Sequence, residues 1–436
     1  MDDRILNSLR RRTELLGWTL RRATQHTTQL FSVGPRIEAE RNVAEERTLI
    51  DVLMPGHAPD GSPACGMGNA TLLPHEPVEP AIDRAIEMAT HVHNPVHGLP
   101  ARAQLPDVPL EDKRLVDRPM ETLRAAHEAL MTLASRRPEV RVTAAEWHAR
   151  TRETQLLNSR GQEGSQRETT LLVEWVLVTG EGEARAENFV GREVRRMADL
   201  AIEAEFQRQA DMAIDRQQAG PAPNWDGKVV LRDAVLATFL NGGPIQFLGS
   251  AANRYAQLTS WEINKSVLRR EGAGDPFTVY ASRILPYGIR SSRMDSEGIP
   301  GQRVLLVADS VLKAFSAGQR YAEYLALPAT GEFGDLEVPP GSTASAELLE
   351  GPHIEVAAFS WFNPDSVTGD FATEIRLGYL VENGNRTPFR GGMLIGNFLD
   401  ALGDARWSRE TGFYSEYRGP TAVRLTGLKV AGRTAG

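Results

Sequence analysis

The clearest hydrophobic pattern in the chain lies near its carboxyl end, in the segment GDFATEIRLGYLVENG at residues 369–384. Every second residue falls on one face of an extended segment, and this face carries Phe371, Thr373, Ile375, Leu377 and Tyr379. Polar residues and glycine occupy most of the other face, so the pattern predicts a strand with one buried side, followed by an Asn-Gly turn. Further strands are predicted over 302–315, 353–362 and 420–432, with a helix over 396–404. We expect a β-rich carboxy-terminal part, built as an antiparallel sheet or open barrel.

The amino-terminal half shows a mixture of patterns. Apolar residues at helical spacing predict helices over 77–92 and 119–135, and the segment 30–74 predicts a small sheet of connected strands. Three strands within 139–180 are expected to precede one long helix, whose apolar stripe is Phe189, Val190, Val194, Met197, Ala201 and Ile202. The fold class predicted for this half is therefore α+β, with small antiparallel sheets and a long helix.

A further amphipathic helix is predicted at the amino end. Its apolar positions are Ile5, Leu6, Leu9, Leu15, Leu16 and Trp18. An arginine cluster falls on the same segment, and we assign it to the solvated face of that helix: Arg10, Arg11, Arg12, Arg21 and Arg22.

Glycine and proline gather in the segment QQAGPAPNWDG at residues 217–227, which is typical of a linker. We therefore expect two domains, an amino-terminal α+β domain over 1–219 and a carboxy-terminal β-rich domain over 226–436.

Composition and charge exclude several classes of protein. Apolar residues make up 41% of the 436 residues and charged residues 24%, which is typical of globular proteins and not of disordered chains. A formal charge of -8 argues against a sequence-independent nucleic-acid binder, whose affinity depends on basic residues. The single cysteine, Cys65, cannot form an intramolecular disulfide. Because neither a signal peptide nor an apolar membrane span is evident, we expect no membrane partner and a cytoplasmic location.

Two acidic residues stand close together in MDSEGIPGQRVLL, residues 294–306. Asp295 and Glu297 would share one face of a strand, so acid/base chemistry is geometrically open to them. However, Asp, Ser, Glu and Gly before a Pro-Gly pair and an apolar run are also what a loop that feeds a strand requires. The residue chemistry favours the loop.

Several segments of the carboxy-terminal half, taken together, resemble the TldD/PmbA family of modulators of DNA gyrase and peptidases. In order, they are DSEGIPGQRVLLVADSVLKAF with RYA at 320–322, VPPGSTASAELLEG at 338–351, NPDSVTGDFATEIRLGYLVENG at 363–384, GGMLIGNFLDAL at 391–402 and LKVAG at 428–432. The positions that carry this signature, with a structural role expected for each, are Asp295, Glu297, Gly298, Gly341, Gly369, Asp370, Gly378, Gly396 and Asn397.

The resemblance also says where a metal site would be. Catalytic TldD-type members of the family carry a helical HExxxH motif with a cysteine near the carboxyl end, which together hold zinc. The matching window here is LNGGPI, so that His, Glu and His are replaced by Leu240, Asn241 and Ile245. Neither HExxH nor HExxxH occurs anywhere in the chain. The sequence is in this respect similar to the family's PmbA/TldE-type subunits, which lack the motif.

The resemblance implies a non-catalytic, metal-free subunit of a heterodimeric zinc metallopeptidase. No cofactor is expected in this chain, and the zinc would belong to a TldD-like catalytic partner. The substrate would be an unfolded peptide or a peptide-like intermediate, and a natural-product pathway such as antibiotic biosynthesis is compatible with the family. An exposed strand edge holds an extended peptide well. The candidate substrate wall is the strand 370–381, with Thr373, Ile375, Arg376, Leu377 and Tyr379.

Two alternative hypotheses belong to other classes. An autonomous homodimeric hydrolase would need its own metal site, for which His91, His93 and His97 form the local histidine cluster. A regulatory module would bind other proteins without catalysis. A half motif, His127 followed by Glu128, has no second ligand one turn later and is interpreted as a pair on a helix surface.

Overall fold

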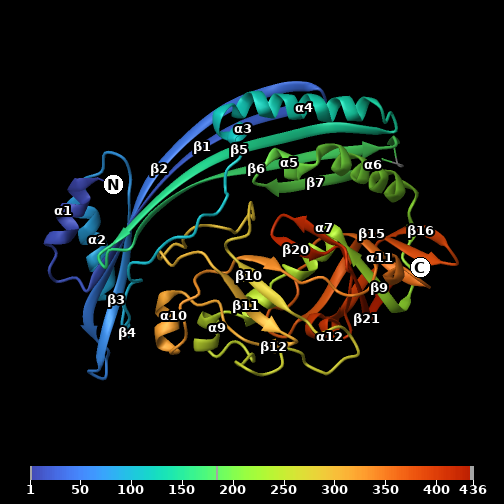
Figure 1. The fold of residues 1–436 in the computed structure, drawn as a ribbon. Coiled ribbons are helices and arrows are strands. Elements are labelled where there is room, and N and C mark those ends of the chain that lie inside the picture. The colour runs from blue at the N-terminus through green and yellow to red at the C-terminus, as the bar shows by residue number, and fades with distance from the viewer. Residues whose placement is uncertain (1, 183–184, 433–436) are drawn as a thin grey trace.

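A large antiparallel sheet forms the amino-terminal half of the computed structural model, which describes residues 2–182 and 185–432. Its seven strands, in spatial order, are β4 (Asn94–Pro95), β3 (Pro63–Leu72), β2 (Arg36–His57), β1 (Gly17–Val33), β5 (Val140–Asn158), β6 (Glu163–Thr179) and β7 (Ala186–Val194). The long strands β1, β2, β5 and β6 curve in an arch above the carboxy-terminal half (Figure 1).

One end of the arch is covered by two helices, α1 (Asp3–Arg11) and α2 (Val78–Thr90). Ile5 and Leu9 of α1 and Ile82 of α2 are buried against Leu20 and Ile50 of the sheet. Asp2 begins α1, because its side chain accepts a hydrogen bond from the amide of Arg4.

The other end of the sheet carries α4 (Pro119–Ser135) and α6 (Ile202–Gln218), and the short helices α3 (Lys113–Asp117) and α5 (Met197–Leu200) precede them. Leu123 and Leu130 lie two turns apart on α4 and pack, with Phe206 of α6, around Trp147 and Trp175 of the sheet. This cluster and the one beneath α1 and α2 give the arch two separate cores.

Two further sheets make up the carboxy-terminal half. The six-stranded sheet has the order β12 (Val311–Leu312), β11 (Arg303–Ala308), β10 (Val279–Ser282), β13 (Asp335–Glu337), β20 (Tyr417–Pro420) and β19 (Thr411–Tyr414). The eight-stranded sheet has the order β14 (His353–Phe359), β9 (Trp225–Arg232), β21 (Ala422–Ala431), β17 (Met393–Asn397), β15 (Asp370–Glu382), β16 (Asn385–Arg390) and β8 (Gly220–Pro221), and β18 (Arg406–Trp407) pairs with β21. Because β14 pairs with both β9 and β15, five of these strands close into a barrel-like ring.

The helices of this half are short. They are α7 (Asp233–Leu240), α8 (Pro244–Leu248), α9 (Ala251–Tyr255), α10 (Gln319–Tyr324), α11 (Ser345–Leu348) and α12 (Phe398–Gly403). Phe239 of α7 and Phe398 of α12 pack ring against ring, 4.8 Å apart, within one core that both carboxy-terminal sheets share. One continuous core therefore holds the carboxy-terminal half together.

A buried arginine joins the arch to the carboxy-terminal half. Arg195 directly follows β7 and is 3% exposed. Its guanidinium donates to the carbonyl oxygens of Gly288 at 2.6 Å, Ile289 at 2.9 Å and Ser291 at 2.8 Å. Glu168 of β6 lies 3.3 Å from the same guanidinium and balances its charge.

The predicted fold class is confirmed: both halves mix helices with mainly antiparallel sheets, and the carboxy-terminal half is β-rich and barrel-like. In the carboxy-terminal half, β13 pairs with β20, β14 with β9 and β16 with β8 in parallel. The helices predicted over 77–92 and 119–135 correspond to α2 and α4. The strand predicted over 370–381 corresponds to β15. The prediction of several small sheets in the amino-terminal half is wrong, because all its strands there belong to a single seven-stranded sheet.

Two predicted helices in the amino-terminal half are wrong in extent. The first helix ends at Arg11, and Trp18 lies in β1. Arg21 and Arg22 therefore do not share a helix face with the earlier arginines; they form ion pairs across β1 and β2, with Asp51 and Glu46. Cross-strand pairing with a distant segment outweighed the local helical spacing.

The long helix predicted from residue 187 begins only at residue 202, where α6 starts. The preceding residues form β7, in which Ala186, Asn188 and Val190 are buried at every second position and Phe189 is 52% exposed. A period of two was therefore present and was mistaken for a period of 3.6.

None of the helices in the described part of the chain is long and apolar enough to cross a membrane.

A close approach between α2 and β3 gives a test of the fold. A Cβ atom at Gly68 would lie 1.9 Å from the carbonyl oxygen of Ala85, which belongs to the helix backbone and cannot rotate away. We expect Gly68→Ala to lower the free energy of unfolding by about 1–3 kcal/mol, as overpacking does. The measurement is urea denaturation followed by circular dichroism.

The matched control for this prediction is Gly220→Ala, because nothing lies within 4 Å of a Cβ atom there. Its effect should stay below about 0.5 kcal/mol. Equal stability of the two variants would show that α2 does not lie against β3 in this way.

Candidate functional site

The window LNGGPI, residues 240–245, which the resemblance matches to HExxxH, lies at the junction of α7 and α8. Leu240 and Ile245 are each 1% exposed and belong to the core of the carboxy-terminal half. Asn241 ends α7, and its side-chain amide donates to the carbonyl oxygen of Ala237 at 3.0 Å. The helix is interrupted at Gly243, whose φ of 118° is outside the helical range, before α8 begins at Pro244.

These residues do not fit a zinc ion. Aliphatic side chains offer no lone pair, and the amide of Asn241 is not among the side chains that usually bind zinc. In HExxxH the two histidines belong to one continuous helix, whereas the matching positions Leu240 and Ile245 are separated here by the break at Gly243. No group of three or more His, Cys, Asp or Glu side chains able to hold a metal occurs within residues 2–182 and 185–432.

The histidine cluster does not converge either. His91 and His93 are exposed, whereas His97 is 7% exposed. The ring of His97 contacts the Sγ atom of Cys65 at 3.2 Å and the hydroxyl of Tyr324 at 3.2 Å. Burial lowers the pKa of His97. The His-based metal site is therefore wrong, since one of the three side chains packs inside the molecule while the other two face solvent.

The interpretation of His127 and Glu128 on α4 as a surface pair is wrong. His127 is 2% exposed and is not part of a surface pair. Its Nε2 atom lies 3.4 Å from the carbonyl oxygen of Pro35, because this face of α4 covers the sheet.

Asp295 organises the loop in which it lies. One carboxylate oxygen accepts hydrogen bonds from the amides of Glu297 at 3.0 Å and Ile299 at 2.8 Å. The other accepts from the amide of Glu332 at 3.2 Å and lies 3.5 Å from the guanidinium of Arg283. Burial raises the pKa of Asp295, and Arg283 opposes this shift. With 5% exposure, Asp295 is a loop-forming residue and cannot reach a substrate.

Glu297 anchors a neighbouring helix. Its Oε2 atom accepts a hydrogen bond of 2.7 Å from the amide of Gln319, the first residue of α10. A carboxylate at this place satisfies an otherwise unpaired amide of the helix. Burial raises the pKa of Glu297 as well. The two acidic residues of the loop therefore act as structural acceptors in separate places.

A third buried carboxylate escaped the sequence analysis. Asp335 of β13 accepts from the amide of Arg290 at 3.0 Å and from the hydroxyl of Ser291 at 2.8 Å. Burial raises the pKa of Asp335 to about 6. The sequence offered no signal for it, because its partners lie 44 and 45 residues earlier in the chain.

Asn397, another signature residue, joins a turn to a helix. Its Oδ1 atom accepts from the amides of Leu399 and Asp400 and so begins α12. Its Nδ2 atom donates to the carbonyl oxygen of Thr368 and to the carboxylate of Asp370, both at 2.8 Å. Asp370 thus has a structural partner as well.

The signature glycines lie where a side chain would not fit. A Cβ atom at Gly341 would be 2.0 Å from the carbonyl oxygen of Trp407, and Gly369 has a φ of 79°. Similar constraints of space or φ apply to Gly298, Gly378 and Gly396.

The predicted substrate wall on β15 is wrong for four of its five side chains. Thr373, Ile375, Leu377 and Tyr379 are each at most 3% exposed, because they fill the core. The strand lies inside its sheet and pairs with β14, β16 and β17, so it presents no long free edge to a peptide. Arg376 is the exception, since it lies on the opposite face and lines a pocket.

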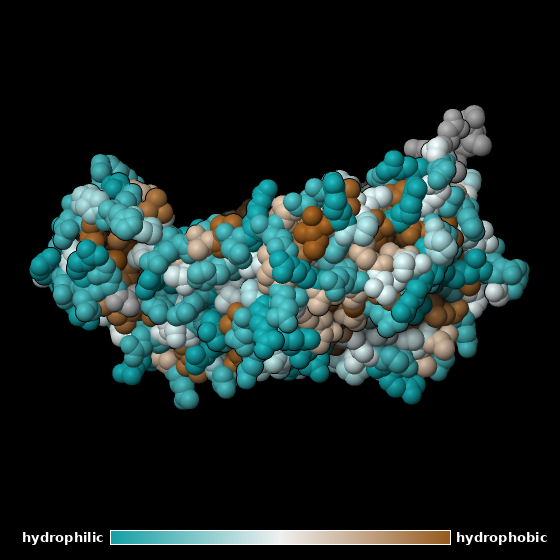
Figure 2. All heavy atoms as spheres, turned by 90° about the horizontal axis from the view of Figure 1, so that it is seen from above, coloured by the Kyte–Doolittle hydropathy of each residue, from teal (hydrophilic) through white to brown (hydrophobic). Residues whose placement is uncertain are grey.

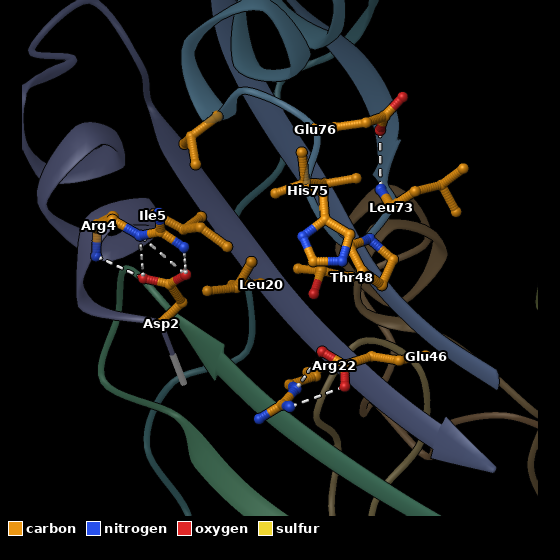
Figure 3. Close-up of a pocket in the computed structure, with 13 residues that line it drawn as sticks. Asp2, Arg4, Ile5, Leu20, Arg22, Glu46, Thr48, Leu73, His75 and Glu76 are labelled. Carbon is orange, nitrogen blue, oxygen red and sulfur yellow. Dashed lines mark hydrogen bonds and ion pairs between the residues drawn. The ribbon is translucent and has the colours of Figure 1, made fainter. Parts of the chain in front are cut away.

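The face of the molecule seen from above is largely hydrophilic, and hydrophobic residues gather there only in separate groups (Figure 2). A pocket of about 340 Å³ lies between α1 and the neighbouring strands. Its charged groups already have partners: Asp2 pairs with Arg4, Arg22 pairs with Glu46, and Glu76 accepts a hydrogen bond from the amide of Leu73 (Figure 3). His75 also lines this pocket. A pocket whose charges are satisfied internally gives little reason to expect a charged ligand.

Comparison with known proteins identifies the carboxy-terminal half. Residues 226–432 match the family model described as the PmbA/TldA metallopeptidase C-terminal domain. The chain is 28% identical over 123 residues to a zinc metalloprotease TldD homolog of Saccharolobus solfataricus, covering 25% of this chain and 28% of that protein. It is 25% identical over 222 residues to a metalloprotease of Methanocaldococcus jannaschii, covering 47% of each chain. The chain spans about half the length or less of the curated relatives that it matches.

Solved structures share the whole fold. TldE from Thermococcus kodakarensis superposes with a TM-score of 0.80 at 16% identity, over 98% of this chain and 99% of that one. A putative modulator of DNA gyrase from Thermotoga maritima gives a TM-score of 0.81 at 18% identity, with the same coverage. A similarly named protein from Bacteroides thetaiotaomicron gives 0.82 at 16% identity, over 99% of this chain and 98% of that one. At these identities the likeness concerns the fold alone.

The buried carboxylate of Asp335 makes stability depend on pH. The folded protein holds the proton more tightly than the unfolded chain, so the stabilisation is complete below the ordinary pKa of 3.8 and is lost as the pH rises through about 6. Asp335→Asn keeps an acceptor for the amide of Arg290 and carries no charge at any pH. Between pH 4 and pH 7, we expect the wild type to lose stability relative to this variant, by roughly 3 kcal/mol at most.

The measurement for Asp335 is the unfolding midpoint of both proteins across this pH range. Asp309→Asn, at an exposed position, is the control and should follow the wild type throughout. A constant difference between the wild type and Asp335→Asn would show that Asp335 does not change its protonation in this range.

Proposed function

Because the chain belongs to the TldD/PmbA metallopeptidase family through its residues 226–432, we propose that it is the subunit without zinc in a two-chain peptidase. In this proposal, a TldD-like partner provides the zinc site and the catalytic residues. The present chain completes the enzyme by closing a shared chamber around an extended peptide or a peptide-like amide. The pair hydrolyses peptide or amide bonds.

One observation supports this proposal: the window that the resemblance assigns to the family's metal-binding helix lies in the core of this chain. Leu240 and Ile245 are buried, and their helix breaks between them at Gly243. Rebuilding a zinc site there would require three polar ligands within an apolar core, at a large desolvation cost. A chain with the family's fold and without room for its ligands is best explained as a structural partner of one that has them.

The relatives support the same division of roles. One protein that resembles this chain is named a zinc metalloprotease TldD homolog, and another, with the same fold, is named TldE. Two names for similar chains suggest two kinds of subunit, and the absence of HExxxH from this sequence favours the second kind. No nucleic-acid partner is proposed, in keeping with the net charge of -8.

Co-expression with a relative that carries HExxxH tests the proposal. We expect the two chains to co-purify at equal stoichiometry through a tag on the present chain. We also expect the pair to cleave an unfolded peptide substrate at least roughly tenfold faster than either chain alone, because each chain lacks part of the site. The measurement combines size-exclusion chromatography with a fluorogenic peptide assay.

The matched control is the same partner with the Glu of its HExxxH changed to Gln, which should still co-purify but show no activity. If the intact partner neither co-purifies nor gains activity, the subunit proposal fails and a regulatory protein-binding role replaces it.

A further inference from the structure

A pocket lies where α6 passes into β8, on the face of β15 that points away from the core. Its volume is about 680 Å³. The end of α6 supplies Arg216, β15 supplies Glu374 and Arg376, and Arg390 comes from the end of β16. Figure 1 shows the chain that follows α6 descending from the arch towards these strands. The pocket therefore lies at the junction of the two halves, among elements that are well separated in sequence.

The charges in this pocket are unbalanced. Three guanidinium groups line it together with a single carboxylate, that of Glu374. This carboxylate accepts a hydrogen bond of 2.8 Å from the hydroxyl of Ser360. Among the described residues, no carboxylate lies within ion-pair distance of Arg216, Arg376 or Arg390. Burial, and then repulsion by the other two arginines, lower the pKa of Arg216.

The side chain of Arg216 has one hydrogen-bond donor without a partner. One terminal nitrogen of Arg216 donates to the carbonyl oxygen of Glu187 at 2.5 Å. The Nε atom of the same side chain is buried and has no hydrogen-bond partner. A buried donor without an acceptor is costly, and native proteins usually satisfy it with protein, water or a ligand.

A neighbouring arginine has a different environment. Arg386, also on β16, lies 3.2 Å from Glu355 and 3.8 Å from Asp215, and it stacks on the ring of Tyr379 at 3.1 Å. Arginine on the same strand is thus neutralised by two carboxylates and an aromatic ring. The lack of comparable partners in the pocket sets its three arginines apart.

We propose that this pocket binds an oxyanion, either a carboxylate or a phosphate group of a small molecule or peptide. The planar guanidinium forks of Arg376 and Arg390 match the paired oxygens of such a group, and Arg216 offers further N–H donors from the third side. A bound anion would neutralise the repulsion among the arginines. The site is independent of the proposed zinc partner, since all its groups belong to this chain.

Titration of the purified single chain tests the proposal, with inorganic phosphate as the first probe and isothermal calorimetry as the measurement. We expect saturable binding that weakens by roughly tenfold or more in the double variant Arg376→Ala/Arg390→Ala, because two charge-assisted contacts are lost. The control double variant Arg84→Ala/Arg418→Ala removes the same charge from exposed positions elsewhere and should bind as the wild type does.

A short alanine peptide with a free carboxyl end, and its amidated form, distinguish the two sources of the anion. Binding of the free acid but not of the amide assigns the site to a carboxylate, whereas binding of phosphate alone assigns it to a phosphate group. If none of these probes binds at millimolar concentration, or if the pocket double variant binds as tightly as the wild type, the proposal is overturned.

The unfolding midpoint without ligand separates loss of binding from loss of structure. Since the three arginines repel one another in the empty pocket, Arg376→Ala/Arg390→Ala should unfold at the same temperature as the wild type or higher. A marked drop in the midpoint would instead assign these arginines a structural role and contradict the proposal.

Discussion

The packing of α7 and α8 into the carboxy-terminal core is the constraint on which the chemistry of this chain depends. Phe239, Leu240 and Ile245 fill the space between two sheets, so the junction of these helices is a part of the hydrophobic core. A core position that loses an aliphatic side chain is destabilised by several kcal/mol, and a polar ligand there would add a desolvation cost. The same packing that stabilises this half of the molecule therefore makes the junction of α7 and α8 unsuited to zinc ligands.

Buried polar side chains fix the shape of loops and connect the amino-terminal half to the carboxy-terminal half. Arg195 donates to three carbonyl oxygens of the loop around residue 290, and Asp335 accepts from the same loop. Asp295 ties the next turn together through three backbone amides. Most of these partners are main-chain groups, so these residues determine backbone shape. This explains why acidic residues that look catalytic in sequence have no access to a substrate.

The sequence predicted the carboxy-terminal half better than the arch, for physical reasons. Strand β15 alternates between core and exterior, and its period of two is visible locally. In β1, the polar residue Gln25 pairs with Glu45 and Arg152, which lie 20 and 127 residues later in the chain, so no local pattern identifies this strand. For the site, the absence of HExxH and HExxxH was visible in the sequence. Asp335 and the arginine pocket were not, because they are assembled from distant elements.

The zinc content of the purified chain alone tests the central claim most directly. After equilibration with zinc and removal of the free ion by gel filtration, mass spectrometry of the metal should find far less than one ion per chain. The same result is expected for His97→Ala, because His97 packs against Cys65 and Tyr324 and does not belong to a ligand set. One tightly held zinc ion per wild-type chain, lost on substitution of a single side chain, would contradict the account.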